Sequence, residues 1–474
     1  MKKITDFDEL KGKRCDVIGI GISNLPLIYM LSEVGAHITA RDKKSREELM
    51  ELCEKLEALG ISLVLGEKYL DDIDTDVIFR SPGVRPDIGS IPDAVKKGAL
   101  LTSEMELFIA LTKARLIAIT GSDGKTTTTT LTHLFLESQL KKIGIGEAYV
   151  GGNIGTPLLS EHKKMTEDDY AVLELSSFQL MTLKSPIARA AITNITPNHL
   201  DWHRNDMEEY ISAKCNIFGD ETLLVLNAEN DITKKIAEKR GKNMVLFSSK
   251  ASSYSEIVPP AMKDTSAVFV KDGYITLSDG NDEITLLKAD DIKLPGKHNL
   301  ENYMTAIALT YPLVDKEIYT SVAKSFSGVP HRLEPVRELD GVFYYNGSID
   351  SSPTRTAAAL SAIKEKKVVI CGGYDKHIPF SPLADALCEN NVRAVILTGA
   401  TAQKIKSAIL ECEKYSPEKF EIIEREDFDE AVLAARNAAK AGDCVLLSPA
   451  CASFDRFKNF ETRGEYFKML VNSF

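Results

Sequence analysis

Residues 115–130 constrain the fold of this chain more than any other segment, and they read RLIAITGSDGKTTTTT. A short apolar run enters a turn that contains two glycines, and a Lys-Thr pair then opens a helix-like stretch. A buried strand that leads through a tight turn into a helix is half of a strand–helix–strand unit. Units of this kind build parallel sheets covered by helices, so the segment predicts an α/β fold.

The same turn predicts a phosphate site. Gly121 and Gly124 allow backbone N–H groups to point inward, and such groups bind phosphate oxygens together with a helix N-terminus. Lys125 would place a positive charge near the β and γ phosphates of a nucleotide, and Thr126 would offer its hydroxyl to Mg²⁺. The spacing is the shorter GxxGKT, since position 119 is Ile. A chance glycine-rich turn is the alternative, and the preceding strand and following threonines argue against it.

Alternating strand and helix patterns divide the chain into three α/β units, with predicted boundaries after residues 103 and 328. Strands are expected at 15–20, 36–40, 76–79, 115–120, 171–175, 190–193, 222–226, 342–345, 367–371, 393–397 and 443–447. Helices are expected at 24–33, 45–59, 104–112, 207–218, 299–309, 353–363 and 401–411. Residues 244–290 combine short strands with polar turns, which suggests antiparallel pairing.

Composition excludes some partners. The net charge of −11 gives no broad basic surface, so we expect no nucleic-acid partner. No apolar run approaches the roughly 18–20 residues that span a bilayer, and acidic residues interrupt the N-terminus as they would not in a secretory signal. We therefore expect a cytoplasmic protein without membrane insertion. Its eight scattered cysteines are expected to be reduced thiols.

Four further side chains are candidates for metal binding or catalysis. Glu174 ends an apolar strand, where a carboxylate is costly unless it is paired or binds a cation such as Mg²⁺. A salt-bridged strand-end glutamate is the alternative. His199 and His203 are four residues apart, but no Glu lies between them as in HExxH, so a two-histidine site is disfavoured. Lys214 lies near the apolar face of a predicted helix, and a snorkelling lysine is the simplest interpretation.

Taken together, several segments resemble the Mur ligases. The matching segments are GSDGKTT, GGNIGTP at 151–157, ELSSFQL at 174–180, NHLD at 198–201, Lys214, GKHNLEN at 296–302, HRLE at 331–334, CGGYDK at 371–376 and SPACASFDRFKNFETRGEYF at 448–467. They cover nearly the whole chain. The last two are typical of the members that add D-glutamate.

The resemblance implies three domains: a Rossmann-like UDP-substrate domain (1–103), a central P-loop ATPase-type domain (104–328) and a Rossmann-like D-glutamate domain (329–474). It also implies a reaction of peptidoglycan precursor synthesis. The carboxylate of UDP-N-acetylmuramoyl-L-alanine attacks the γ-phosphate of ATP, and the amine of D-glutamate then displaces phosphate from the acyl phosphate. The protein mainly positions groups and neutralises phosphate charge in such a reaction. We expect a monomer.

The resemblance also assigns roles to individual residues. The predicted ATP-binding residues are Gly121, Ser122, Asp123, Gly124, Lys125, Thr126, Thr127, Asn299, Asn302 and Arg332. The predicted Mg²⁺ ligands are Thr126, Glu174, His199 and Lys214, the lysine as a carbamate, and the predicted catalytic residues are Lys125, Glu174, His199 and Lys214. The predicted UDP-substrate contacts are Ile22, Ser23, Asp42, Ser81, Gly83 and Asn153. The predicted D-glutamate contacts are Lys376, Ser453 and Phe460, the last through its backbone.

The sequence departs from the family pattern at one place. Mur ligases of this kind usually have Asn-Asp-Ser at the start of the C-terminal domain, with the aspartate directed at the nucleotide, but residues 346–348 are Asn-Gly-Ser. Asp350 follows three residues after Gly347, and we expect its side chain to point elsewhere. An active ligase with altered ATP contacts is the favoured interpretation, and a catalytically weakened variant is the alternative.

Three other functions are consistent with single features. A folylpolyglutamate-synthetase-like ligase shares the phosphate loop, but the Rossmann-like N-terminal domain and SPACASFDRFKNF argue against it. An NAD-dependent oxidoreductase is suggested by the GIGIS turn at 19–23, but it leaves the phosphate loop unexplained. A non-catalytic protein that binds the UDP-sugar is suggested by Gly347, and turnover distinguishes it from the enzyme.

Overall fold

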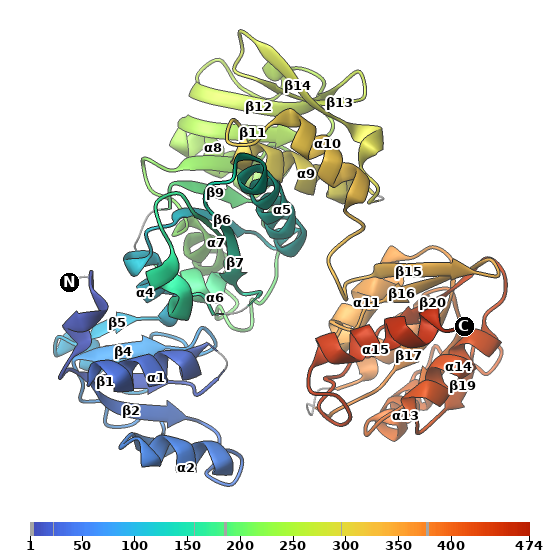
Figure 1. Cartoon of the computed structure of the whole chain (residues 1–474). Helices are drawn as coiled ribbons and strands as arrows, with labels where there is room; N and C mark the ends of the chain where they lie inside the picture. Colours follow the sequence, from blue (N-terminus) through green and yellow to red (C-terminus); the bar gives the residue numbers. More distant parts are fainter. Residues whose placement is uncertain (1–3, 22, 156, 184–186, 295, 376–378) are drawn as a thin grey trace. The chain divides into compact units, whose positions relative to one another are not determined.

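Three sheets of mainly parallel strands organise the part of the chain that the computed structural model describes, residues 4–21, 23–155, 157–183, 187–294, 296–375 and 379–474 (Figure 1). The chain divides into two compact units, Met1–Phe326 and Ser327–Phe474. The first unit contains two of the sheets and the second contains one. The predicted α/β class is confirmed, whereas domain boundaries after residues 103 and 328 stay a prediction.

The N-terminal sheet is entirely parallel. Its strands, in sheet order, are β3 (Ser62–Leu65), β2 (His37–Asp42), β1 (Arg14–Ile18), β4 (Val77–Arg80) and β5 (Leu100–Thr102). The helices between them are α1 (Asn24–Val34), α2 (Met50–Ala58) and α3 (Ile91–Lys96), and α4 (Glu104–Leu111) follows. The strand order reverses between β1 and β4, and ligands of open α/β sheets bind at the carboxyl ends of strands at such a reversal.

The central sheet is parallel except at one edge. Its strands, in sheet order, are β14 (Glu283–Lys288), β13 (Tyr274–Ser278), β12 (Lys263–Lys271), β11 (Lys242–Ser248), β10 (Leu223–Asn227), β9 (Arg189–Ile192), β6 (Arg115–Thr120), β8 (Tyr170–Glu174) and β7 (Ala148–Gly152). Its helices are α5 (Lys125–Ile143), α6 (Ser177–Leu180), α7 (Met207–Cys215), α8 (Asp231–Arg240), α9 (Lys297–Thr310) and α10 (Lys316–Ser325). The expected antiparallel pairing is confirmed for β12–β14, whereas β11 and β12 are parallel.

The C-terminal sheet is covered by helices on both faces. Its strands, in sheet order, are β15 (Glu334–Leu339), β16 (Val342–Asn346), β20 (Asp443–Leu447), β17 (Lys366–Cys371), β18 (Val392–Leu397) and β19 (Glu421–Glu424), and only β15 is antiparallel to its neighbour. Val369 and Cys371 pack with α11 (Pro353–Ala362), α12 (Ser381–Glu389) and α13 (Ala402–Glu411). Val368 and Ile370 pack with α14 (Phe428–Ala438) and α15 (Phe460–Asn472). Successive strand residues point to opposite faces, so an unbroken apolar strand requires both layers.

One predicted helix begins later than expected. The pattern over 45–59 predicts a helix from its first residue, but α2 starts at Met50. The backbone N–H of Ser45 donates to Glu48 Oε2 at 2.8 Å, and that of Glu48 lies 3.4 Å from Ser45 Oγ. These reciprocal bonds form a capping box around a separate turn, in which the Leu49 N–H donates to the Arg46 carbonyl at 3.3 Å, and α2 begins only after this turn.

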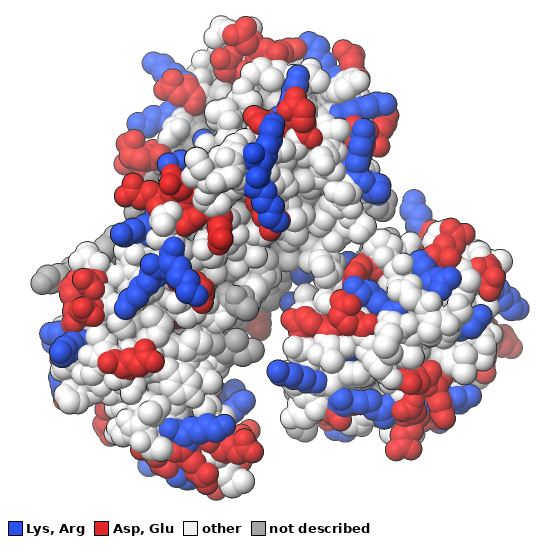
Figure 2. Space-filling view, in the orientation of Figure 1, with Lys and Arg blue, Asp and Glu red and all other residues white. Residues whose placement is uncertain are grey.

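The charged surface is mixed. Lys and Arg alternate with Asp and Glu over the face shown in Figure 2, without a field of one sign. None of the described helices has the length and apolar character needed to cross a membrane.

A buried ion pair next to the predicted UDP-substrate loop gives a test of stability. Arg41 Nε donates to Asp16 Oδ2 at 2.5 Å, and both residues are buried. The Arg41→Ala substitution leaves Asp16 buried without its cation, so we expect unfolding to cost about 3–5 kcal/mol less. Urea unfolding followed by circular dichroism measures this change. The matched control is Arg46→Ala, which removes an exposed pair with Glu57 and should change stability far less; equal effects would contradict the prediction.

Candidate functional site

The phosphate loop connects β6 to α5 at the carboxyl end of the central sheet. Gly124 precedes α5 with a φ of 80°, a left-handed conformation that favours glycine. Gly121 has a φ of 148°, and a Cβ there would lie 1.9 Å from Thr193 Oγ1. The Thr193 hydroxyl donates to the carbonyl of Asp123 at 2.5 Å. Both glycines are therefore required by the loop conformation, and Gly121 also by its packing against the end of β9.

The middle of the loop is held by the segment that follows β9. Ser122 Oγ donates to the carbonyl of Thr196 at 2.8 Å and lies 3.0 Å from the Tyr210 hydroxyl. The Asp123 N–H donates to Asn194 Oδ1 at 2.9 Å. The sequence predicted Ser122 and Asp123 as nucleotide contacts but did not single out these three partners, because they are 70 or more residues away along the chain.

Two lysines converge on the carbonyl groups of the loop. Lys125 Nζ donates to Gly121 O at 3.0 Å and to Ser122 O at 2.8 Å. Lys214 Nζ, from α7, donates to the same Gly121 oxygen at 2.7 Å and lies 4.6 Å from the centre of the Tyr210 ring. Only 2% of Lys214 is exposed, so the interpretation of a snorkelling lysine is wrong. Burial lowers the pKa of Lys214 to about 6, and the charge of Lys125 acts in the same direction.

Glu174 ends β8 beside this loop and is almost completely buried. Its Oε1 accepts a hydrogen bond from Asn153 Nδ2 at 2.9 Å. Its Oε2 is buried and has no hydrogen-bond partner among the described residues. A buried carboxylate oxygen of this kind is costly unless a cation binds to it, and Mg²⁺ prefers oxygen ligands. The contact also joins Asn153, predicted to bind the UDP-substrate, to a predicted metal ligand.

Two further predicted metal ligands are Thr126, in the first turn of α5, and His199, in the segment after β9. Thr126 is buried and, with Thr127, lies in the first turn of α5. His199 adopts a left-handed φ of 51°, and its ring packs edge-on against Phe178 with centroids 5.2 Å apart. Burial lowers the pKa of His199, as does the charge of Lys125, which favours the neutral imidazole that ligates metals.

A metal at this position would need ligands from the substrates. Among the described residues, no group of three or more His, Cys, Asp or Glu side chains is placed to hold a metal ion. The predicted set contains only one glutamate and one histidine, completed by a hydroxyl and by Lys214. Mg²⁺ commonly binds one or two carboxylates together with substrate phosphates and water. The residues present therefore fit Mg²⁺ that arrives with a nucleotide.

Two asparagines of α9 lie next to the phosphate loop, where α9 runs alongside α5 (Figure 1). Asn302 Oδ1 accepts from the Thr128 hydroxyl at 3.2 Å, and Asn302 Nδ2 donates to Asn299 Oδ1 at 3.3 Å. A Cβ on Gly124 would lie 2.4 Å from Asn302 Oδ1. The fold thus places Asn299 and Asn302, both predicted to bind ATP, next to the phosphate loop, although more than 170 residues separate them from it in the sequence.

Four of the predicted UDP-substrate residues lie at the ends of β1, β2 and β4, where the strand order of the N-terminal sheet reverses: Ser23, Asp42, Ser81 and Gly83. Asp42 Oδ2, at the end of β2, accepts from the backbone N–H of Ile20 at 2.7 Å. A Cβ on Gly19 would lie 2.7 Å from Ser81 Cβ, so glycine permits the turn after β1 to approach the loop after β4. Ile22 lies outside the described residues.

A pocket in the first unit lies beside these residues. It is lined by Ser23, Asn24, Arg80, Pro82, Ser103, Glu104, Met105, Gly152, Gly155, Pro157 and Gln179. Arg80 is fully buried and donates to the carbonyls of Val84 at 2.7 Å and Phe178 at 2.9 Å. Burial lowers the pKa of Arg80 to about 10, so it remains charged. The pocket joins Ser23 and the segment after β4 to the residues on either side of Asn153.

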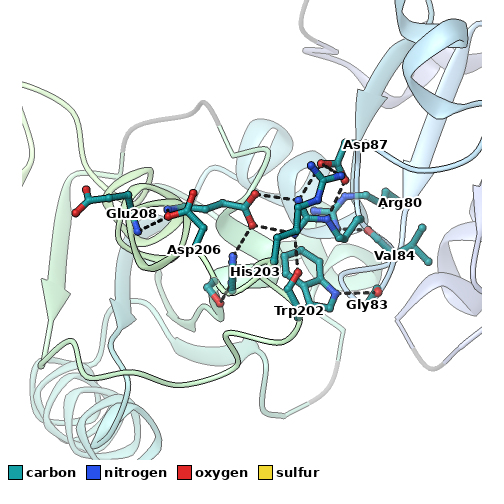
Figure 3. Close-up of polar contacts among 12 residues, drawn as sticks. Arg80, Gly83, Val84, Asp87, Trp202, His203, Asp206 and Glu208 are labelled. Atoms are coloured by element: carbon teal, nitrogen blue, oxygen red, sulfur yellow. Dashed lines mark hydrogen bonds and ion pairs between the residues drawn. The ribbon is translucent and has the colours of Figure 1, made fainter.

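A polar network connects the loop after β4 to the segment before α7 and to α7 itself (Figure 3). Arg85 donates to both oxygens of Glu209, at 2.8 and 2.9 Å, and to both oxygens of Asp87 at 2.8 Å. It also donates to the carbonyl of Trp202 at 2.6 Å, and the Trp202 indole donates to Gly83 O at 3.2 Å. The predicted UDP-substrate segment at Gly83 is thereby tied to the helix that carries Lys214.

His203 extends this network toward Glu174. It is fully buried, with Nδ1 3.0 Å from Glu209 Oε1 and Nε2 2.9 Å from Ser177 Oγ. Ser177 opens α6, three residues after Glu174. Because both ring nitrogens are engaged by the protein, His203 is not available as a metal ligand. No local pattern in the sequence indicates Arg85 or Glu209, since these two residues are 124 positions apart in the chain.

In the second unit, several loops meet at Arg463 of α15, a residue that the sequence did not single out. Arg463 is buried and donates to Ser348 Oγ at 3.0 Å and to the carbonyls of Ser348, Cys451 and Ala452 at 2.9–3.1 Å. Ser348 Oγ donates to the carbonyl of Phe460 at 2.8 Å. The end of β16, the loop after β20 and the start of α15 are thus held together.

Ser453 and His331 of the HRLE segment lie near this junction. Ser453 is buried in the loop after β20. His331 Nδ1 lies 3.0 Å from Asn346 Nδ2, and a Cβ on Gly464 would lie 2.1 Å from the same His331 nitrogen. Arg332 follows His331 in the chain, and Lys376 lies outside the described residues. A pocket is lined by Ile370, Gly372, Gly373, Thr398, Gly399, Phe428, Leu447, Pro449, Asp455, Arg456, Phe457 and Arg463.

Because the Lys214 amine is buried, we expect its removal to increase the free energy of unfolding. With a pKa lowered from 10.5 to about 6, Lys214 loses its proton on folding between these pH values, so stability should rise with pH across that window. The cost of the buried charge is complete below pH 6. We expect Lys214→Met to stabilise the ligand-free chain at pH 6 by on the order of 5 kcal/mol, with a smaller effect at pH 9. Lys239→Met, at an exposed position of α8, is the control; a gain independent of pH would contradict the assignment.

The Arg85 network predicts a change in the environment of Trp202, the only tryptophan of the chain. Arg85 lies over the indole ring at 5.0 Å from its centre. We expect Arg85→Ala to shift the fluorescence maximum of Trp202 to longer wavelength, because water reaches the ring, and to lower the midpoint of urea unfolding monitored by fluorescence. Arg204→Ala is the matched control, since Arg204 is mostly exposed and contacts Asp87 alone. Identical spectra for both variants would show that the network does not enclose Trp202.

Two family profiles match the chain: the Mur ligase middle domain over residues 119–310 and the Mur ligase glutamate ligase domain over residues 331–451. The chain is 45% identical over 476 residues to the UDP-N-acetylmuramoylalanine--D-glutamate ligase of Clostridium perfringens, covering 99% of each chain. It is 47% identical over 481 residues to the enzyme of the same name from Clostridium beijerinckii, covering all of both chains.

Solved structures agree on the fold. The UDP-N-acetylmuramate-alanine ligase MurC of Thermotoga maritima aligns with a TM-score of 0.52 at 20% identity, covering 97% of this chain and 99% of that one. A pseudomurein peptide ligase type C from Methanothermus fervidus aligns with a TM-score of 0.50, also at 20% identity and with the same coverage. The chain therefore belongs to the Mur ligases, a family of ATP-dependent, ADP-forming amide ligases.

Proposed function

We propose that this chain ligates D-glutamate to UDP-N-acetylmuramoyl-L-alanine with consumption of ATP, in peptidoglycan precursor synthesis. One observation carries the proposal: a phosphate loop with two lysines on Gly121 O lies at the end of β6, beside the buried Glu174 carboxylate at the end of the adjacent β8. Cations and backbone donors at one sheet edge suit a polyphosphate. The name of the relatives at 45–47% identity specifies the acceptor and the amino acid.

The residues of the loop account for the first step. The N–H groups at the start of α5 and the ammonium of Lys125 bind and orient the β and γ phosphates, which leaves the γ-phosphorus open to the substrate carboxylate. A carboxylate oxygen forms the new P–O bond, and the bond to ADP breaks. Bound Mg²⁺ would supply further charge neutralisation, with Thr126, Glu174, His199 and Lys214 as its candidate ligands. The amine of D-glutamate then attacks the carbonyl carbon, loses a proton and displaces phosphate.

The environment of Lys214 suits a carbamylated lysine that binds Mg²⁺. Its amine is buried and poised to be neutral, and a neutral amine forms a carbamate with CO₂ by making an N–C bond and releasing a proton. The product is an anion, which would remove the repulsion between Lys214 and Lys125 and add oxygen atoms that suit Mg²⁺. This modification is part of the proposal.

The remaining assignments complete the proposal. Ile22, Ser23, Asp42, Ser81, Gly83 and Asn153 hold the UDP-substrate, and Lys376, Ser453 and Phe460 hold D-glutamate. Asn299, Asn302 and Arg332 complete the ATP site. We infer a cytoplasmic monomer with three domains. A non-catalytic protein that binds the UDP-sugar is the alternative, because Gly347 lacks the carboxylate that the family usually has.

Phosphate release tests the reaction. With ATP, Mg²⁺ and UDP-N-acetylmuramoyl-L-alanine, we expect release that depends on D-glutamate and is much slower with L-glutamate. Lys125→Ala should reduce the rate by at least about 100-fold, since it removes a charge that stabilises the transferred phosphoryl group. Its affinity for the UDP-substrate, measured by calorimetry, should stay unchanged. Measurable binding of the UDP-substrate without phosphate release by the parent chain would favour the non-catalytic alternative.

A further inference from the structure

Gly347 and Asp350 compete for one space at the carboxyl end of β16. A Cβ built on Gly347 would lie 2.7 Å from Asp350 Oδ2 and 2.7 Å from the carbonyl oxygen of Leu447. Distances below 3.0 Å are not tolerated between such atoms without movement. The Asp350 carboxylate therefore occupies volume that a side chain at position 347 would enter.

A tight turn explains how a residue three positions away returns to this place. The Asp350 N–H donates to Gly347 O at 2.9 Å, which closes a four-residue turn. The Gly347 N–H donates to Leu447 O at 2.7 Å, and the Ser348 N–H donates to Asn346 Oδ1 at 3.1 Å. The turn is thus fixed against the end of β20, and its fourth residue folds back over its first.

The carboxylate is held in a defined position. Asp350 is 7% exposed, and its Oδ2 accepts from Ser448 Oγ at 2.8 Å. Ser448 follows β20, the neighbour of β16, and its hydroxyl also lies 2.9 Å from Thr356 Oγ1 in α11. Burial raises the pKa of Asp350 to about 6, while the positive charges of Arg332, Arg355 and Arg463 act in the opposite direction. A buried carboxylate that follows the end of a parallel strand is placed where α/β folds bind ligands.

We propose that Asp350 is the nucleotide-directed carboxylate of the C-terminal unit and takes the role that Gly347 cannot fill. The proposal rests on the proposed ATP-dependent function and adds a nucleotide-binding residue to it. Gly347 then suits Asp350 rather than being a defect, because a second carboxylate at this place would collide with the first and repel it, and the Leu447 carbonyl also restricts a side chain at position 347. Arg332, predicted to contact the phosphates, is among the charges that act on Asp350.

Variants that remove the carboxylate at position 350 or place one at position 347 test this proposal. Four variants of the full chain are required: Asp350→Ala, Asp350→Asn, Gly347→Asp and the double variant Gly347→Asp/Asp350→Ala. Affinity for ADP with Mg²⁺, measured by calorimetry, is the first readout, because it requires no turnover. The KM for ATP, compared with that for D-glutamate, is the second. Thermal unfolding of each variant shows whether it is folded, and Asp350→Asn keeps the size of the side chain and a partner for Ser448.

Asp350→Ala and Asp350→Asn should each weaken ADP binding and raise the KM for ATP by about tenfold or more, as expected for loss of a charged hydrogen-bond acceptor. The KM for D-glutamate should change little. Gly347→Asp alone should also weaken ADP binding, whereas the double variant should bind more tightly than either single variant. Asp340→Asn, an exposed carboxylate in the turn between β15 and β16, is the matched control and should bind ADP as the parent does.

One outcome would overturn the proposal: ADP binding that is unchanged in an Asp350→Asn variant that thermal unfolding shows to be folded. A parent chain that binds ADP but shows no ligation of D-glutamate would refute the proposed reaction alone, since the binding data still decide the role of Asp350. A parent chain that binds no adenine nucleotide would refute both.

Discussion

The carbonyl oxygen of Gly121 accepts hydrogen bonds from the side-chain nitrogens of Lys125 and Lys214, and the phosphate loop is built around this contact. Two like charges at one acceptor repel each other, which is why Lys125 contributes to the lowered pKa of Lys214. An anion or a carbamate at this place relieves the repulsion. The loop is therefore organised for a ligand with several negative charges, and the buried carboxylate of Glu174 adds an oxygen that suits its counterion.

A series of hydrogen bonds connects the same region to the loop after β4 of the N-terminal sheet. Arg85 reaches from the loop after β4 to Glu209 on α7, and Glu209 contacts His203, which contacts Ser177 near Glu174. Lys214 lies on the same helix as Glu209. The loop at Gly83 and the helix that carries Lys214 are therefore linked by one hydrogen-bonded path.

In the C-terminal unit, polar groups from several loops are buried at one junction. Arg463 satisfies carbonyl groups from two loops, and Gly464 leaves room for His331. Asp350 lies in the same region and is held by Ser448. The turn from Gly347 to Asp350 brings residue 350 back beside residue 347. A carboxylate at position 350 can therefore lie where a carboxylate at position 347 would lie.

Local sequence patterns predict the α/β class, many of the strands and helices, and the phosphate loop, because these depend on apolar runs, glycines at left-handed positions and the Lys-Thr pair. They do not predict the later start of α2, which follows a separate turn closed by Ser45 and Glu48. Only the tertiary structure placed Lys214 in a buried site, paired Arg85 with Glu209 and returned Asp350 to Gly347. These contacts depend on which loop ends meet at the edges of the sheets, and sequence spacing carries no direct measure of that distance.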